Sequence, residues 1–415
     1  MKLEWFIARR YMSSRRGARF LSLITLIAIG GVAVGVMALI VVTAVMTGLQ
    51  RDLRDKILGT NPHIWVTTYG AAMRMDDWAT TLQKVRESPE VAAAAPFIHT
   101  EVGLRNQAGY AEFAILRGIA PEAAGEPITD VVRDIRSGAL KLGPTVSGEP
   151  PLLVGDALAD RFSLYPGDIV TVISLQAGDR VTAFGTVMPE MHRFEIAGRF
   201  RTGMFEYDNK FMYTTLPAAQ EVTGLGSAVT GLEIRVPDAM HADAVGRDLE
   251  KRLGGYPYRA EDWKSANASL FSALKLEKLA MEVILGLIVI VAAFNIISTL
   301  VMVVTDKTRE IGILKSMGLT SRQVLRLFLM QGLVIGVVGA TLGTLGGLTL
   351  TWLLDKYEFI SIPGDVYFID RLPVALDPSD IGLILVLSVL ISFAATLYPA
   401  RQAARLLPVE AIRHD

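Results

Sequence analysis

The sequence predicts a membrane protein of four transmembrane α-helices with a large α+β domain inserted between helices 1 and 2. Three observations lead to this fold class. The 415-residue chain is 51% hydrophobic, and its mean hydropathy is positive, at +0.39. Its apolar residues gather in four uncharged stretches, 20–50, 283–305, 327–354 and 381–400, and each reaches the ~20 residues that cross a bilayer as a helix. The segment 51–282 between the first two stretches is long enough to form its own core.

Composition and missing motifs exclude several classes of function. The chain has 41 basic and 42 acidic residues, and the resulting net charge of −1 gives no support for nucleic-acid binding. It has no cysteine, which rules out disulfides, thiolate metal sites and cysteine nucleophiles. The five histidines are scattered, and neither a Walker ATP motif nor a Gly-x-Ser-x-Gly motif occurs. We therefore expect no catalytic residue, metal or cofactor in this chain. The uncharged spans also argue against an ion-coupled transporter or an intramembrane protease.

The charges beside the four stretches predict their orientation. Basic residues dominate the segments 1–19, 306–326 and 401–415, whereas the loop 355–380 carries six acids against two bases. The positive-inside rule then places both termini and the 306–326 loop in the cytoplasm. The 51–282 domain and the 355–380 loop are expected outside. The basic and aromatic residues of 1–19 are typical either of an amphipathic helix at the membrane surface or of a solvated flank.

The inserted domain reads as a mixture of strands and short helices. No helix breaker follows the first stretch before Gly59, so its helix is expected to continue into the inserted domain. Apolar residues at helical spacing over 270–282 predict that the helix of the second stretch likewise begins inside this domain. Strands are expected at 63–68, 100–105, 111–117, 151–154, 169–174, 181–186, 194–200, 211–214 and 231–236. Helices are expected at 76–87, 131–140, 155–162 and 240–253. The stretch 127–215 is predicted to form an inserted subdomain.

Two features of the membrane part carry more specific information. The third stretch has glycines at 332, 336, 339, 343 and 346, a spacing that predicts close helix packing, and ordinary packing is favoured over a gating role. In the loop after the second stretch, Ile311, Leu314 and Met317 are predicted to share one face of a short helix that ends at Gly318. This apolar face either docks on a partner or lies on the bilayer.

The whole chain resembles the MacB/FtsX-type ABC permeases. The resemblance rests on the four-span layout and on the loop sequence TREIGILKSMGLTSRQV at 308–324. Within that superfamily, LIVVTAVMTGLQRDLRDKILG at 39–59 and LYPARQAARLLPVEAIRHD at 397–415 look like the lipoprotein-releasing permeases of the LolC/LolE type. The sequence has no fused ATPase domain, which also agrees with the LolC/LolE type.

The resemblance implies a complex in the bacterial inner membrane. Such a complex has a dimer of ABC ATPase subunits, which bind ATP and Mg, and a second permease that is identical or homologous to the first. It extracts acylated lipoproteins from the outer leaflet and passes them to a periplasmic carrier. By resemblance, the 306–326 loop is the coupling helix that contacts the ATPase. The residues assigned to this contact are Glu310, Ile311, Ile313, Leu314, Met317 and Gly318.

Two further sites are expected outside the coupling loop. An apolar stripe lies in the upper half of the first span and consists of Val42, Val45, Met46 and Leu49. Its spacing fits acyl-chain contact and plain lipid or helix contact equally well. The resemblance implies acyl-chain contact, where span one meets span two of the partner permease. The long gap between the expected strands 169–174 and 194–200 predicts a protruding arm, which the resemblance identifies as a hook for the carrier. Its contact residues are Val187, Met188, Pro189 and Met191. The alternative is a loop that folds back on its own domain.

Other functions stay open from the sequence. A permease of the same superfamily could export another substrate or regulate periplasmic cell-wall hydrolases. A receptor or scaffold anchored by four spans is a third class, but it would not need an apolar helix in the loop. Association with an ATPase distinguishes this third class from the first two.

Overall fold

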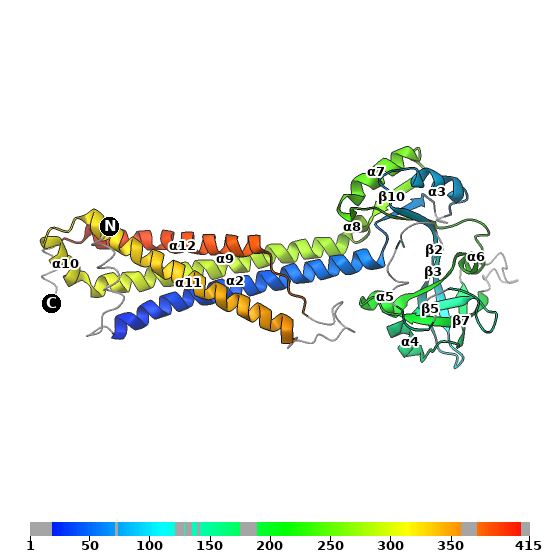
Figure 1. Cartoon of the computed structure of the whole chain (residues 1–415), viewed down its shortest axis with the longest axis horizontal. Helices are drawn as coiled ribbons and strands as arrows, with labels where there is room; N and C mark the ends of the chain where they lie inside the picture. Colours follow the sequence, from blue (N-terminus) through cyan, green and yellow to red (C-terminus); the bar gives the residue numbers. More distant parts are fainter. Residues whose placement is uncertain are drawn as a thin grey trace, which may run out of the picture. The chain divides into compact units, whose positions relative to one another are not determined.

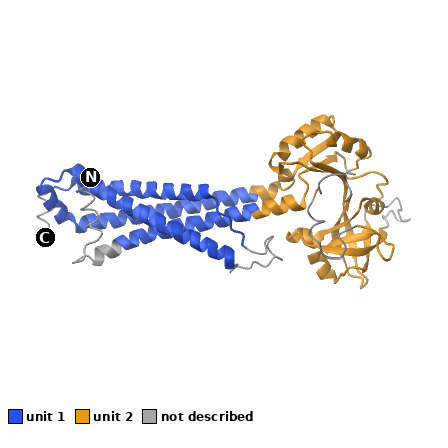
Figure 2. Cartoon of the chain, viewed as in Figure 1, with its two compact units in different colours: residues 1–51, 273–361, 371–415 blue, residues 52–272, 362–370 orange. Residues whose placement is uncertain are grey.

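The structure is a computed structural model that describes residues 19–70, 74–120, 128, 135–138, 142–174, 189–357 and 372–407. The chain divides into two compact units (Figure 2). Unit 1 comprises residues 1–51, 273–361 and 371–415, and unit 2 comprises residues 52–272 and 362–370.

Four long helices make up most of unit 1 (Figure 1): α2 (Arg19–Thr60), α9 (Ala268–Asp306), α11 (Ser321–Tyr357) and α12 (Pro378–Arg405). All four are long and apolar enough to cross a membrane. Each contains one of the four predicted stretches, so this part of the prediction is confirmed. The predicted helical extensions are confirmed as well, because α2 ends at Thr60 and α9 begins at Ala268. A short fifth helix, α10 (Thr308–Ser316), joins α9 to α11.

The glycines of α11 lie at two different helix contacts. Gly336 faces α12, where an added Cβ would lie 2.6 Å from the Ser392 Cβ. Gly339 and Gly343 face α2 instead, and an added Cβ at Gly343 would lie 2.5 Å from the Ala33 carbonyl oxygen. The missing side chains therefore let α11 approach two neighbouring helices at backbone distance. This is the close packing that the glycine spacing predicts.

Unit 2 is built on one ten-stranded sheet, ordered β10-β1-β9-β2-β3-β8-β5-β7-β4, with β6 paired to both β2 and β7. The strands are β1 (Ile64–Thr68), β2 (Ala93–Arg105), β3 (Ala111–Ile119), β4 (Ile135–Gly138), β5 (Pro151–Gly155), β6 (Ile169–Ser174), β7 (Glu190–Phe200), β8 (Phe211–Thr215), β9 (Gly231–Arg235) and β10 (Tyr258–Asp262). The pairs β2–β3–β8–β5–β7–β6–β2 close a ring. The first half of β2 pairs with β9 and the second half with β6, so β2 belongs both to the ring and to the open part of the sheet.

Each part of the sheet has its own apolar core. The open part packs against α3 (Trp78–Arg86) and α7 (Ala242–Arg252), with Trp263 among the fully buried side chains. The ring encloses a second core that also receives α4 (Asp156–Phe162) and α6 (Leu216–Thr223). The shorter helices are α5 (Phe205–Lys210), the 3₁₀ helix η2 (Ala239–His241) and α8 (Trp263–Ala266). Because Val102 and Leu116 share the ring core with residues of β5 to β8, the described strands β5 to β8 of the predicted subdomain are packed together with β2 and β3.

The structure differs from the sequence prediction at several elements of unit 2. The helix predicted over 131–140 is wrong for residues 135–138, which form β4 and pair with the end of β7. Backbone pairing to an existing strand outweighs the weak helical preference of four residues. The sequence reading also missed α5, α6 and β10, and it began β2 too late. The strand predicted at 181–186 lies outside the described residues.

A buried ion pair connects β3 and β9 across β2. Arg117 lies opposite His99 of β2, and Glu233 lies opposite Ala95 of the same strand. The Arg117 guanidinium donates to the Glu233 carboxylate, and both side chains are almost fully buried. Near them, the Tyr207 hydroxyl donates to the Asn61 Oδ1 at 2.8 Å. Polar contacts thus lie inside an otherwise apolar part of unit 2.

Candidate functional site

Helix α10 begins and ends within the loop that was predicted to contact an ATPase. The Lys307 Nζ donates to Glu310 Oε1 at 2.5 Å at its first turn. Gly318 follows the helix with φ +104°, in the left-handed region that glycine adopts without strain. The Thr320 hydroxyl and the Gln323 side chain then hydrogen-bond at the start of α11. The short predicted helix and its glycine stop are therefore present.

The side chains of α10 divide between an inner and an outer face. Met317 is 79% exposed and Ile313 45% exposed, and Glu310 is exposed on the same side at i, i+3, i+7 spacing. Leu314 is half-buried. Ile311 is 2% exposed and packs with Val304, Phe328 and other residues of α9, α11 and α12.

This division corrects the predicted apolar face. Ile311 does not share an exposed face with Leu314 and Met317, because it holds α10 against the helices of unit 1. Sequence spacing alone could not separate the two faces, since isoleucine suits an inner contact as well as an outer one. Of the residues assigned to the ATPase contact, Glu310, Ile313, Met317 and Gly318 are exposed.

The α2 stripe of Val42, Val45, Met46 and Leu49 is half-buried throughout. The opposite side of the helix carries Ala44 and Gly48, which are buried. There the chain before α12 crosses α2: the Ala375 N–H donates to the Ala44 carbonyl at 3.0 Å, and a Cβ on Gly48 would clash with the Pro373 backbone. The sequence reading missed this crossing. The available signal was the pair of small residues Ala44 and Gly48, four positions apart.

An apolar pocket lies in unit 1 between α2, α9 and α12. Its lining residues are Val32, Gly35, Val36, Leu39, Ile288, Val289, Ala292, Ala293, Ile296, Ser388, Ile391 and Ser392. None of the four stripe residues is among them. Pocket and stripe are therefore separate stretches of α2, and the pocket precedes the stripe along the chain.

The carrier-binding arm is expected in the connection between strands β6 and β7. They pair from Ile169 with Glu195 to Ser174 with Glu190, so the intervening chain leaves from the end of this ladder. A connection of this length far exceeds the ~2–5 residues of a simple hairpin. Val187 and Met188 lie outside the described residues, and Pro189 is exposed. Met191 is 59% exposed but lies in β7 opposite Ile173, so it belongs to the ladder and not to the predicted arm.

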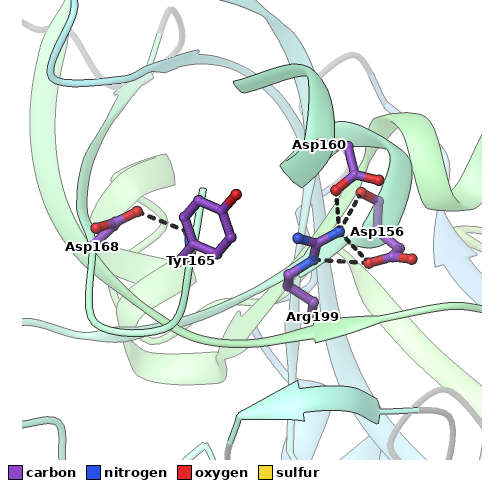
Figure 3. Close-up of polar contacts among 5 residues, drawn as sticks. All are labelled: Asp156, Asp160, Tyr165, Asp168 and Arg199. Atoms are coloured by element: carbon purple, nitrogen blue, oxygen red, sulfur yellow. Dashed lines mark hydrogen bonds and ion pairs between the residues drawn. The ribbon is translucent and has the colours of Figure 1, made fainter. Parts of the chain in front are cut away.

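An ion-pair cluster fixes the other end of β7 to α4 (Figure 3). The Arg199 Nε donates to Asp156 Oδ1 at 2.8 Å, and its Nη2 also contacts the Asp160 carboxylate. In the nearby turn, Asp168 Oδ2 accepts the Tyr165 N–H at 2.8 Å (Figure 3). These contacts anchor the ring. In the part of the chain that the structure describes, no group of three or more His, Asp and Glu residues could hold a metal ion.

Comparison with known proteins gives the family. The model of the FtsX-like permease C-terminal region matches residues 282–408, and the model of the MacB-like periplasmic core domain matches residues 25–252. The lipoprotein-releasing system transmembrane protein LolC of Xylella fastidiosa (strain 9a5c) is 37% identical over 418 residues, which are 99% of this chain and 98% of that relative.

Two further relatives extend the comparison. LolC of Neisseria meningitidis serogroup B is 35% identical and covers 100% of this chain and 99% of its own length. LolE of Haemophilus influenzae, another lipoprotein-releasing system transmembrane protein, is 28% identical and covers 99% of both chains. Since these similarities extend over the whole length, the chain belongs to the family of lipoprotein-releasing system transmembrane proteins, among the MacB/FtsX-type permeases.

Proposed function

We propose that this chain is the permease subunit of an ATP-driven complex of the bacterial inner membrane that extracts acylated lipoproteins from the outer leaflet and hands them to a periplasmic carrier. The observation that carries the proposal is the 35–37% identity with LolC proteins over essentially the full chain. Lipoprotein release needs work, because each CH₂ group of a buried acyl chain holds the substrate in the bilayer by ~0.8 kcal/mol. A separate ATPase dimer, which binds ATP and Mg, supplies that work.

The orientation follows from the charges beside the spans. Both termini and α10 face the cytoplasm, where the ATPase is, and unit 2 and the 355–380 loop face the periplasm. The exposed residues Glu310 and Ile313 of α10, and Met317 and Gly318 directly after it, contact the ATPase, together with the half-buried Leu314. Ile311 contributes by holding α10 in place. A second permease, identical or homologous, completes the membrane part.

Reconstitution tests the function directly. The chain is co-expressed with its ATPase and any second permease and placed in proteoliposomes loaded with a triacylated lipoprotein. ATP is expected to cause release of the lipoprotein to a soluble periplasmic carrier, with a non-hydrolysable ATP analogue as the control. Release that does not depend on ATP, or ATP hydrolysis that never produces release, contradicts the proposal.

We infer that the stripe on α2 contacts the acyl chains. Photo-crosslinking residues at Val42 and Met46 are expected to capture lipoprotein in the reconstituted complex. Leu26, on the same helix, is 64% exposed and so more accessible than either of them. Exposure alone would therefore give more labelling at Leu26. Equal or stronger labelling at Leu26 indicates ordinary lipid contact at the stripe.

The arm between β6 and β7 is the proposed contact with the carrier. A connection that leaves the ladder next to an exposed methionine suits protein binding, because methionine adapts to irregular apolar surfaces. Met191→Asp is expected to weaken carrier binding in a pull-down by about tenfold or more, since it puts a charge on an apolar contact. Met240→Asp, which changes a 48% exposed methionine of η2, is the matched control. Equal carrier binding by both variants contradicts the assignment.

A further inference from the structure

Lys315 makes a contact that the coupling function does not by itself require. It lies in the last turn of α10, and its side chain points to the end of α12. The Nζ donates to the Ala404 carbonyl at 2.9 Å and to the Leu406 carbonyl at 2.7 Å. Both acceptors are separated from Lys315 by about ninety residues of chain, so the contact joins two helices that no short loop connects.

The acceptors belong to a helix end that needs partners. Helix α12 ends at Arg405, and the last four carbonyls of an α-helix have no intrahelical N–H to bind. The same end carries the negative pole of the helix dipole, which attracts a cation. An ammonium group with three donors therefore completes the end of α12 both by hydrogen bonding and by charge.

The apolar contacts beside Lys315 lead to the same pair of helices. Ile311, one turn earlier on α10, packs in a cluster with Ala400 and Ala403 of α12. Lys315 and Ile311 thus hold α10 against α12 by a polar and an apolar contact. The chain itself connects α10 only to α9 and α11.

We propose that Lys315 is a positioning residue that makes α12 move together with the coupling helix. The proposal rests on the proposed function, in which the ATPase acts on α10. A displacement of α10 reaches α9 and α11 through covalent bonds. It reaches α12 through the contacts of Lys315 and Ile311. Of the two, only Lys315 forms hydrogen bonds, which depend on direction as well as distance. Three of the four membrane helices, α9, α11 and α12, then respond to the ATPase together.

Lys315→Met tests the proposal, because methionine keeps an unbranched apolar side chain and removes the donors. In the reconstituted complex, the variant is expected to hydrolyse ATP within about twofold of the wild type. Lipoprotein release per ATP is expected to fall at least about fivefold, within the range typical of coupling between two sites. Lys315→Arg, which keeps a cation with several donors, is expected to retain most of the coupling.

Arg405→Met is the matched control. It also removes one positive charge at the end of α12, but Arg405 is exposed and lies on α12 itself. Release per ATP should stay at the wild-type level. If lipoprotein release per ATP falls equally in Lys315→Met and Arg405→Met, the loss of positive charge alone explains the effect and the proposal is overturned. The proposal is equally overturned if Lys315→Met loses ATPase binding, because Lys315 would then belong to the docking surface.

A spectroscopic measurement gives a readout that does not depend on transport. The chain has no cysteine, so spin labels can be attached at two introduced cysteines without altering the background. Labels on the exposed positions Arg309 of α10 and Gln402 of α12 report the distance between the helices in the full-length chain in nanodiscs. Lys315→Met is expected to broaden the distance distribution. An unchanged distribution contradicts the proposed link.

The two levels of the proposal fail in different ways. If the wild-type complex releases no lipoprotein with ATP, the proposed function is wrong. If the wild type releases lipoprotein and Lys315→Met releases the same amount per ATP, the function stands and the role of Lys315 is wrong.

Discussion

Glu233→Gln is expected to destabilise unit 2 by about 3–5 kcal/mol, the usual cost of removing one partner from a buried ion pair. The substitution keeps the shape of the side chain but leaves the Arg117 guanidinium buried without its counter-charge. Burial raises the pKa of Glu233, whereas the Arg117 charge acts in the opposite direction and favours the ionised carboxylate. For a domain of this size, the loss corresponds to a fall in Tm of about 10 °C.

Thermal unfolding of the full-length chain in detergent measures this effect. Trp263, 1% exposed in the core of unit 2, supplies a fluorescence signal that changes when this core opens. Glu112→Gln is the matched control, because Glu112 forms a partly exposed pair with Arg161, and such pairs contribute about 0–1 kcal/mol.

A double variant distinguishes the cost of an unpaired charge from the value of the pair. Arg117→Met with Glu233→Met removes both charges and leaves apolar side chains in their place. Its stability is expected to return most of the way to that of the wild type, because the desolvation of both ions is avoided. A double variant as unstable as Glu233→Gln would show that the ion pair itself, and not charge compensation, maintains this region.

Met317→Asp is expected to separate the permease from its ATPase. Met317 is 79% exposed, so a charge there leaves the packing of unit 1 intact. At a docked surface, however, the carboxylate would be desolvated without a partner. A central contact residue typically contributes about 2 kcal/mol or more, which corresponds to a loss of affinity of about 30-fold or more. Co-purification of the ATPase with the tagged permease measures the loss, and lipoprotein release should fall with it.

The control for this prediction is Leu407→Asp, which places the same charge on a 57% exposed apolar residue beyond the end of α12. ATPase binding should be close to normal in this variant. Leu314→Asp is a less direct test, since Leu314 is half-buried and its substitution disturbs packing as well as docking. Normal ATPase binding by Met317→Asp would mean that another surface contacts the ATPase.

The membrane helices could be predicted from the sequence because their signal is local. Each needs only an uncharged apolar run of sufficient length. The extension of α2 needed only the absence of a helix breaker, and that of α9 needed only apolar residues at helical spacing. The strands β6 and β8 were found for a similar reason, since β-branched and aromatic residues occur there in short runs.

The elements that were missed depend on partners far away in the chain. Residues 135–138 become a strand because β7 offers an edge, and no signal within the segment indicates β7. On α10, Ile311 and Met317 look equivalent in the sequence, but only Ile311 meets the cluster formed by α9, α11 and α12. The Lys315 contact was missed because its acceptors are main-chain carbonyls, which every residue carries.

The packing of α11 determines which glycines of the membrane helices can be replaced during evolution. Any replacement at Gly336 or Gly343 adds at least a Cβ, and at Gly343 that atom would meet the main chain of α2, which cannot rotate away. By contrast, Gly286 of α9 and Gly382 of α12 have open space around them and can accept alanine. Over evolutionary time, glycine should therefore persist where α11 crosses its neighbours, while the glycines of α9 and α12 are free to be exchanged.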